Sequence, residues 1–561
     1  MDIDKQELST DCVDSEYNKK ILSEHGEFMS NNVQLYKDTA VLVMISVLLV
    51  LCSVLLLTGC TTIKGQQEVS RHSQGQIDLF LKGTDDASVD ISFDLAAVDI
   101  MAEDGTYREL MSAPLNINSL AMRGRQILLA EKTLPEGRYK KLRFVVSRAL
   151  IRRKGVIARL ALPPEGIEIP VSITIYKDQN TSLFLTWDAD ASVVDKYLFK
   201  PDFSVKGQVP ELSSLLVYVT NEDSDNVSVI NRQLGEVVAT VRVGRKPRGI
   251  AAGLRRERLR VYVANSGSNS ISVIDPTTNK VEQEIPIRFG SEPEGIAVAR
   301  GPSGEELIFV ADYGSDTVSV VDATTYQEID KVDVGNGPIA VAVDPPAETV
   351  TASRFLSLED VNILRNYRER YFNVYVVNKD SRDVSVLRMD LQRNRFEEVV
   401  RLSVEWNPVA LAVDYQRGKV YVANYGSDRL SVIDIIEVIK GNEAGAVSDI
   451  SSVGTSVTGV VVDPTFDRIY LLREVPGEIM IIRPFLENYY TADTVMPLVT
   501  GTIPVGTSPR SMIMDPEARN LYVVNRESDN VSVVDKTARK VERVIPVGKN
   551  PYGIAMFPYY E

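Results

Sequence analysis

Cysteine and histidine, the side chains that most often bind transition metals or act in nucleophilic catalysis, are confined to the first part of the chain. The cysteines are Cys12, Cys52 and Cys60, and the histidines are His25 and His72. Residues 73–561 therefore cannot form a disulfide, a thiolate cluster, a histidine-bound metal site or a Ser-His-Asp triad. These exclusions favour a function that depends on binding over one that depends on catalysis.

Carboxylates are the remaining candidates for binding a cation. Asp188 and Asp190 stand at the end of a predicted strand, and with Asp195 these carboxylates could form a cation site. Aspartate at a turn more commonly caps the backbone, and we favour that interpretation. The same two interpretations apply to aspartates in repeated polar turns: Asp223, Asp225, Asp316, Asp428 and Asp529. We predict no metal and no other cofactor, and whether the central channel binds an ion stays open.

An uninterrupted apolar segment covers residues 39–58 and is long enough to span a bilayer. It ends in Leu57-Thr58-Gly59-Cys60, which resembles the lipobox of bacterial lipoproteins. That resemblance implies cleavage just before Cys60 and a diacylglycerol on its thiol, with residues 1–59 as the signal segment. The alternative is an uncleaved transmembrane helix. The stretch before the apolar segment is long and acidic, so translation could start at Met1 or at Met29.

Both alternatives place the rest of the chain outside the cytoplasm. Residues 60–75 are polar and are predicted to form a flexible, lipidated tether. Thr61 follows the cysteine, and by analogy with enteric lipoproteins the absence of an aspartate there is typical of the outer membrane. We expect an outer-membrane lipoprotein, periplasmic or surface-exposed, with anchoring in the inner membrane as the alternative.

The chain is acidic, with a formal net charge of −15. An acidic surface repels phosphate backbones, so we expect no nucleic acid partner. Contact with the membrane is expected through the lipid on Cys60 alone.

Residues 76–207 are predicted to form a β-sandwich, because short alternating apolar segments are separated by turn residues. The expected strands cover residues 76–82, 89–95, 97–102, 126–131, 141–147, 155–162, 171–175 and 182–188. Three segments, LPEGRY at 134–139, LTWDAD at 185–190 and KP at 200–201, resemble the bacterial domain of unknown function 4382. The resemblance implies a sandwich and says little about activity. Residues 208–214 are expected to be a linker.

Residues 215–561 contain an internal repeat. Each unit has an aromatic residue, Val, a variable residue and usually Asn, followed by a polar turn and a segment similar to VSVID. A Val-Gly-x-x-Pro segment follows in most copies, although Gly454 is followed by Val457 in place of Pro. The aromatic positions are Tyr218, Tyr262, Phe309, Tyr375, Tyr421, Tyr470 and Tyr522. Spacings of 44 to 66 residues are typical of four-stranded propeller blades.

The repeat resembles the YVTN family of β-propeller repeats, whose name-giving segment stands at residues 218–221. The resemblance implies an all-β protein in which an N-terminal β-sandwich precedes a seven-bladed β-propeller. The region opens on a segment that corresponds to the second strand of a blade. It ends on a segment that corresponds to the first strand of a blade, YGIAMF at 552–557. We therefore predict that the C-terminal strand pairs with the N-terminal blade and closes the ring.

Three copies of the repeat carry insertions, at about residues 347–372, 435–452 and 485–500. Ser357 and Asp360 predict the start of a helix over 357–371, with Val361, Leu364 and Tyr371 at helical spacing. All three insertions are expected on one face of the propeller. The hypothesis is that this face binds a partner, and the alternative is tolerated variation in loop length. The candidate contact residues are Tyr367, Tyr371, Tyr489 and Tyr490.

The function predicted from these features is that of an envelope-anchored, non-enzymatic binding or scaffold lipoprotein. Its expected partner is an unidentified envelope protein or glycan, bound by a propeller face. The alternative is a propeller enzyme of the lactonase or cofactor-dependent dehydrogenase type, with a channel site that lacks histidine. We predict no catalytic residue, and Trp187 and Trp406 are too few to suggest a quinone site.

Overall fold

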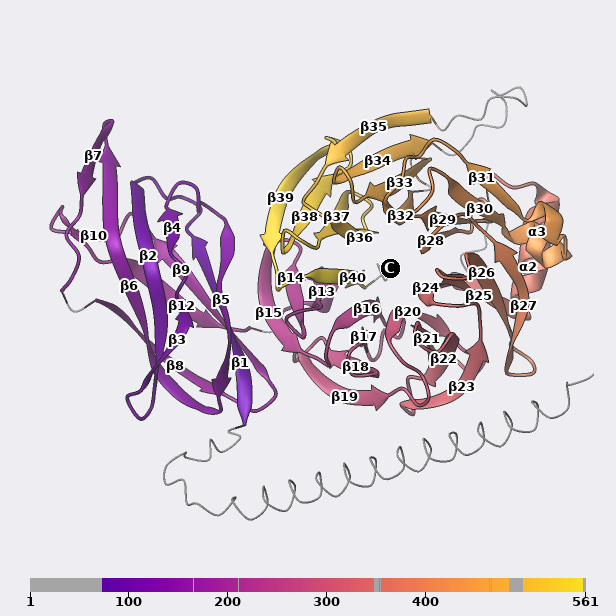
Figure 1. Ribbon diagram of the computed structural model, residues 1–561, viewed down its shortest axis with the longest axis horizontal. Coiled ribbons are helices and arrows are strands. Elements are labelled where there is room, and N and C mark those ends of the chain that lie inside the picture. Colours follow the sequence, from indigo (N-terminus) through magenta and orange to yellow (C-terminus); the bar gives the residue numbers. More distant parts are fainter. Residues whose placement is uncertain are drawn as a thin grey trace, which may run out of the picture. The chain divides into compact units, whose positions relative to one another are not determined.

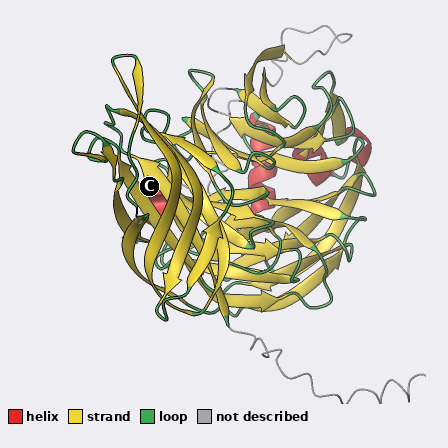
Figure 2. Cartoon of the chain, turned by 60° about the vertical axis from the view of Figure 1, so that its left-hand side comes forward, coloured by secondary structure: helices red, strands yellow, loops and turns green. Residues whose placement is uncertain are grey.

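The computed structural model describes residues 73–557, except residues 165, 210, 348–352, 354, 464, 466 and 484–497. Ser73–Glu561 forms one compact unit, in which strands dominate (Figure 2). No helix among the described residues is long and apolar enough to cross a membrane. The apolar segment 39–58 and Cys60 lie outside the described residues.

Two β-sheets form the N-terminal part. The first has the strand order β12-β9-β1-β5, and β1 pairs with β9 in parallel. The second has the order β3-β2-β6-β7, with β4 also on β2 and β8 also on β6. The bounds are β1 Gln74–Gly83, β2 Asp90–Ala102, β3 Tyr107–Met111, β4 Leu115–Asn118, β5 Gln126–Pro135, β6 Gly137–Arg153, β7 Val156–Arg159, β8 Ile167–Ile175, β9 Asn180–Asp188 and β12 Asp202–Gly207. A separate hairpin joins β10 (Val193–Val194) and β11 (Leu198–Phe199).

Side chains from both sheets share one hydrophobic core, which makes this part a sandwich. The buried Trp187 meets Phe93 edge to face, with 5.1 Å between ring centroids. The sequence predicted separate strands at 89–95 and 97–102, but β2 is one strand with register shifts near Leu95. Irregular pairing at that point lets a single strand continue where the apolar alternation breaks.

From residue 216 onward, the described residues form four-stranded antiparallel sheets of one design. Ordered from the inside outward, the sheets are as follows: β40 (Pro551–Met556), β13 (Leu216–Asn221), β14 (Asn226–Asn231), β15 (Glu236–Arg242); β16 (Pro247–Ala252), β17 (Val261–Asn265), β18 (Ser270–Asp275), β19 (Lys280–Pro286); β20 (Pro293–Arg300), β21 (Glu306–Asp312), β22 (Thr317–Asp322), β23 (Gln327–Asp333); β24 (Pro338–Val343), β25 (Tyr371–Asn378), β26 (Asp383–Asp390), β27 (Arg395–Ser403); β28 (Pro408–Asp414), β29 (Lys419–Asn424), β30 (Leu430–Asp434), β31 (Val447–Ile450); β32 (Val457–Asp463), β33 (Arg468–Arg473), β34 (Glu478–Arg483), β35 (Leu498–Pro504); and β36 (Pro509–Met514), β37 (Asn520–Asn525), β38 (Asn530–Asp535), β39 (Lys540–Pro546).

These sheets are arranged radially in a propeller-like fold (Figure 1). Their innermost strands are neighbours in the order β40, β16, β20, β24, β28, β32 and β36, and β36 again contacts β40. The C-terminal strand β40 pairs antiparallel with β13, with Tyr218 opposite Ala555. Strands β13 and β14 are buried along their whole length, because their sheet packs between two neighbours.

Helices occur at few places in the described residues. Helix α2 (Leu358–Arg368) lies between β24 and β25, and α3 (Ile435–Lys440) lies between β30 and β31. The 3-10 turns η1 (Ser213–Leu215) and η3 (Glu443–Gly445) are short. The predicted helix over 357–371 is confirmed in its start, because the Ser357 hydroxyl accepts a hydrogen bond from the Asp360 N–H at 3.1 Å. Its predicted end is wrong, because Tyr371 begins strand β25.

The sandwich and the four-stranded sheet that contains β13 meet within the compact unit. Asp78 on β1 accepts a hydrogen bond from Asn180 at 3.0 Å and is also bonded to the hydroxyl of Thr240 on β15. Phe80 and Phe184 stack with 5.3 Å between centroids, and Phe80 packs in one cluster with valines of β13 and β15. Burial raises the pKa of Asp78 to about 7.

Candidate functional site

A buried asparagine at the end of the second strand explains the repeated motif. In the fourth sheet the Asn378 amide donates to the Ser385 hydroxyl at 2.9 Å and to Asp383 at 2.6 Å. A Cβ atom on Gly335 would lie 2.6 Å from the Asn378 nitrogen, so only glycine fits in the Val-Gly-x-x-Pro segment. The same Asn-to-Ser bond recurs in other sheets: Asn221 to Ser228, Asn265 to Ser272, Asn424 to Ser431 and Asn525 to Ser532.

The aspartates of the polar turns link each sheet to the next loop along the chain. Carboxylates of Asp225, Asp316 and Asp529 accept hydrogen bonds from backbone N–H groups of residues 246, 337 and 550, at 2.7 to 2.8 Å. All three aspartates have a positive φ, as hairpin turns of this kind require. These contacts fit the predicted turn role.

The two weak metal candidates also bind backbone groups. Asp188 accepts hydrogen bonds from the N–H groups of Asp190 and Ala191, at 2.9 and 3.0 Å. Asp190 accepts from the N–H groups of Ser88 and Val89. Within the described part of the chain, no group of three or more His, Cys, Asp or Glu side chains is placed to hold a metal ion.

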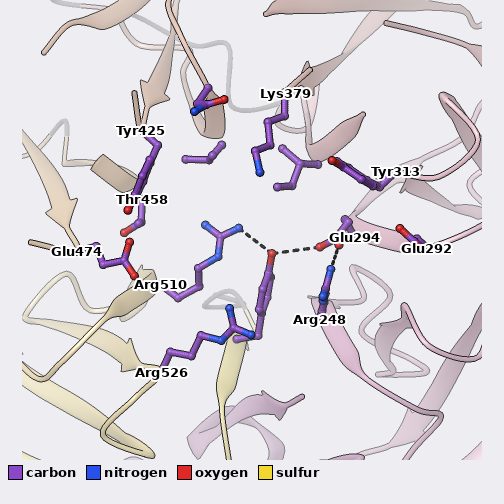
Figure 3. Close-up of a pocket in the computed structure, with 14 residues that line it drawn as sticks. Arg248, Glu292, Glu294, Tyr313, Lys379, Tyr425, Thr458, Glu474, Arg510 and Arg526 are labelled. Atoms are coloured by element: carbon purple, nitrogen blue, oxygen red, sulfur yellow. Dashed lines mark hydrogen bonds and ion pairs between the residues drawn. The ribbon is translucent and has the colours of Figure 1, made fainter. Parts of the chain in front are cut away.

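A cavity of about 450 Å³ lies at the axis of the propeller-like region (Figure 3). Most of its lining residues lie beside the Pro position of Val-Gly-x-x-Pro or directly after the position of the motif asparagine. The lining residues are Arg248, Glu292, Glu294, Tyr313, Ile339, Lys379, Asn407, Val409, Tyr425, Thr458, Glu474, Arg510, Arg526 and Tyr552. These residues were not predicted, because the repeat is recognised by the residues that recur, whereas the lining residues occupy positions that vary.

One side of the cavity wall is a network of paired charges. Arg248 forms ion pairs with Glu222 at 2.8 Å and with Glu294, and Arg526 also pairs with Glu222. Both glutamates are buried, so the two arginines offset charges that would otherwise be costly to bury. The Tyr552 hydroxyl donates to Glu294 at 3.1 Å and extends this network toward Arg510.

Two cations in the cavity, Arg510 and Lys379, form no ion pair with a carboxylate of the described residues. The Arg510 guanidinium donates to the Tyr552 hydroxyl at 2.7 Å and lies over the Tyr552 ring, 4.6 Å from its centroid. Lys379 follows the motif asparagine of β25, and Figure 3 shows its ammonium group and the Arg510 guanidinium both pointing into the open centre. Among the described residues, no ion pair includes either side chain.

Tyrosines and an acid complete the wall. A hydrogen bond to Glu474 raises the pKa of Tyr425, and Glu474 also accepts from the Ser508 hydroxyl at 2.6 Å. Burial and a hydrogen bond to Asp380 at 3.0 Å raise the pKa of Tyr313. Both tyrosines therefore stay protonated at neutral pH and can donate or accept hydrogen bonds.

The predicted contact tyrosines lie elsewhere. The cavity is at the end where innermost strands begin, whereas α2 and α3 connect strands at the opposite end. Tyr367 is partly buried, and its hydroxyl donates to Asn373 at 2.6 Å. Tyr371 packs against Tyr367, with 5.2 Å between centroids, and against Arg388. Tyr489 and Tyr490 lie outside the described residues.

Residues 66–201 match the family model described as "Domain of unknown function (DUF4382)", as the resemblance of the first domain implied. A search of curated proteins finds no match. Hydrazine synthase from Kuenenia stuttgartiensis is similar in structure, with a TM-score of 0.45 and 18% identity over 58% of this chain and 93% of that chain.

Two further solved structures are similar. A functionally unknown protein from Desulfotomaculum acetoxidans DSM 771 has a TM-score of 0.47 and 11% identity, over 62% of this chain and 100% of that chain. A 6-phosphogluconolactonase-like protein from Bacteroides uniformis ATCC 8492 has a TM-score of 0.45 and 14% identity, over 61% and 99%. At these identities the similarities carry nothing about activity.

Proposed function

We propose that this chain is a binding protein of the cell envelope, in which the axial cavity takes the ligand and a lipid on Cys60 provides the anchor. The observation that carries the proposal is the cavity of about 450 Å³, into which charged and tyrosine side chains converge from most of the surrounding sheets. A concave site with few, well-placed polar groups is the usual form of a ligand site.

The proposal includes a closed propeller of seven blades. Two observations support it: the innermost strands follow one another around a circle, and β40 pairs with β13. A closed ring leaves no free sheet edge, and its innermost strands hold the lining residues rigidly.

Binding is favoured over catalysis by the state of two of the three lining carboxylates, Glu294 and Glu474. Glu294 is engaged by Arg248 and Tyr552, and Glu474 is engaged by Tyr425 and Ser508. A general base needs a lone pair that is available to the substrate. Both acids act here as acceptors within the cavity wall.

The site differs from the one that the insertions suggested, so the experiment compares the two ends. Ile339→Trp would fill the cavity, and Leu358→Trp adds the same side chain to the exposed face of α2 at the opposite end. Each variant is used as the full chain, purified in detergent, for capture from solubilised envelope and on a glycan array.

We expect Ile339→Trp to lose the partner and Leu358→Trp to retain it, with unchanged circular dichroism for both. The reverse pattern would contradict the cavity proposal and favour the face with the insertions.

The anchor has a separate test. Metabolic labelling with palmitate should mark the wild-type chain and leave Cys60→Ser unmarked and released from the membrane fraction. A Cys60→Ser chain that stays in the membrane would favour the uncleaved transmembrane helix.

A further inference from the structure

We infer that the axial cavity recognises an anionic group, a carboxylate or a phosphate, held between Arg510 and Lys379. The inference rests on the proposed binding function and adds the chemical class of the ligand.

The charges of the wall argue for this position. Arg248 and Arg526 are each paired with buried glutamates, so these two arginines have little capacity left for a ligand. Arg510 and Lys379 point into the same open centre (Figure 3), and neither forms an ion pair with a carboxylate in the part of the chain that the structure describes. Two like charges that face one partly enclosed space repel each other, and an anion between them converts that repulsion into attraction.

The geometry of Arg510 is set in advance. Its guanidinium is fixed against the Tyr552 ring and hydroxyl, and the Tyr552 hydroxyl is itself fixed by Glu294. A planar guanidinium held in this way can present its remaining N–H groups to two oxygens of a carboxylate or phosphate. Lys379 adds a flexible point charge from the opposite wall.

The rest of the cavity suits a small polar body attached to that anion. Tyr313 and Tyr425 offer protonated hydroxyls and ring faces, and Ile339 and Val409 add apolar surface. Glu292 and Glu474 also line the cavity and disfavour a second negative charge close to them. The expected ligand therefore carries its charge at one end and hydroxyl groups along its body.

Calorimetry on the purified full-length chain tests the inference with three probes: D-glucuronate, inorganic phosphate and D-glucose. We expect at least one anion to bind with a dissociation constant below about 1 mM, and D-glucose to bind much more weakly. Binding of D-glucuronate alone identifies a carboxylate, and binding of phosphate alone identifies a phosphate group. If neither anion binds in this range, or if D-glucose binds as tightly as D-glucuronate, the inference is wrong.

Variants connect any binding to the two cations. Arg510→Gln and Lys379→Gln should each weaken the anion by about 10- to 100-fold, as expected for losing a hydrogen bond to a charged group. Arg510→Lys should lose less, because it keeps the charge. The control is Arg401→Gln, whose side chain pairs with Glu398 on the outer strand β27. Equal anion affinity in all four variants would also overturn the inference.

Failure here is distinguishable from failure of the proposed function. Suppose that a neutral partner binds the wild type and Arg510→Gln equally well but does not bind Ile339→Trp. The cavity would then still be the binding site, and only the inference of an anionic ligand would be wrong.

Discussion

The two ends of the propeller-like region use their polar side chains in opposite ways. At the end with the insertions, Asp344 accepts hydrogen bonds from the Asn373 N–H at 2.8 Å and from the Tyr375 hydroxyl at 3.0 Å. Arg368 of α2 lies 3.7 Å from the same carboxylate and donates to the Pro345 carbonyl at 2.8 Å. At the cavity end, Arg510 and Lys379 have no carboxylate partner among the described residues.

The difference is what the proposed binding role of the cavity end predicts. The polar groups around Asp344 attach helix α2 to the sheet, so they contribute to folding and are occupied. Of the cavity cations, Arg510 is held in place by Tyr552 and Lys379 faces the open centre (Figure 3). An insertion with tyrosines is therefore a weaker sign of a binding surface than polar groups that the fold positions and leaves unpaired.

The largest expected effect is on stability at the inserted end. Arg368→Leu leaves the buried carboxylate of Asp344 without its cation and should lower the free energy of unfolding by about 3 kcal/mol. The double variant with Asp344→Asn should recover part of that loss, because the buried charge is gone. Urea unfolding measures both. A loss below about 1 kcal/mol would mean that α2 is not attached through this contact.

The stability of the same end should also depend on pH. Burial raises the pKa of Asp344 from 3.8 to about 6 despite the nearby Arg368. The folded protein thus keeps this proton to higher pH than the unfolded chain, so the stability that Asp344 contributes is greatest below about pH 4 and decreases as pH rises to about 6. The total change is up to about 3 kcal/mol.

Unfolding of the wild type and of Asp344→Asn over this pH range isolates that contribution. The decrease in the free energy of unfolding with rising pH should be smaller in Asp344→Asn than in the wild type. An equal decrease in both would show that Asp344 is not its source.

A smaller loss of stability is expected at the cavity end, where Gly335 lies close to the motif asparagine. Gly335→Ala places a Cβ atom 2.5 Å from side-chain atoms of Asp383 and Ser381, and should destabilise the fold by about 1 to 3 kcal/mol. Gly207→Ala is the matched control, since nothing lies within 4 Å of its Cβ position. Thermal unfolding of the pair decides the point, and equal midpoints would show that the loop can adjust.

The smallest effect on stability is expected for the cavity cation itself. Arg510→Gln removes no ion pair, so the free energy of unfolding should change by less than about 1 kcal/mol. Measured beside Arg368→Leu, this variant tests the comparison directly. A large loss for Arg510→Gln would indicate that Arg510 serves the fold and not a ligand.

Much of the fold was predictable from local pattern. Tyr218 and its counterparts mark the second strand of each four-stranded sheet, because β-branched and aromatic residues in short runs suit strands buried on both faces. Ser357 correctly predicted the start of α2. Helical spacing assigned Tyr371 to the helix, but pairing with β26 places it in strand β25. Local spacing predicts a helical turn, but it contains no information about a strand elsewhere in the chain that can pair with the same residues.

The cavity was not predictable from any single segment. Arg510 and Lys379 stand at unremarkable positions after a proline and an asparagine, more than a hundred residues apart in sequence. A comparison of equivalent positions across the repeats would have found them, since those two positions vary while their neighbours are mostly constant.

By itself, the sequence determined that the chain folds as repeated short strands and that no histidine or cysteine chemistry is available beyond residue 72. Periodicity and composition act locally, so they can be read from the chain directly. Only the tertiary structure decided which variable side chains meet at the axis and which charges stay unpaired. Radial packing brings together residues from distant repeats, and pairing depends on distances that no sequence spacing contains.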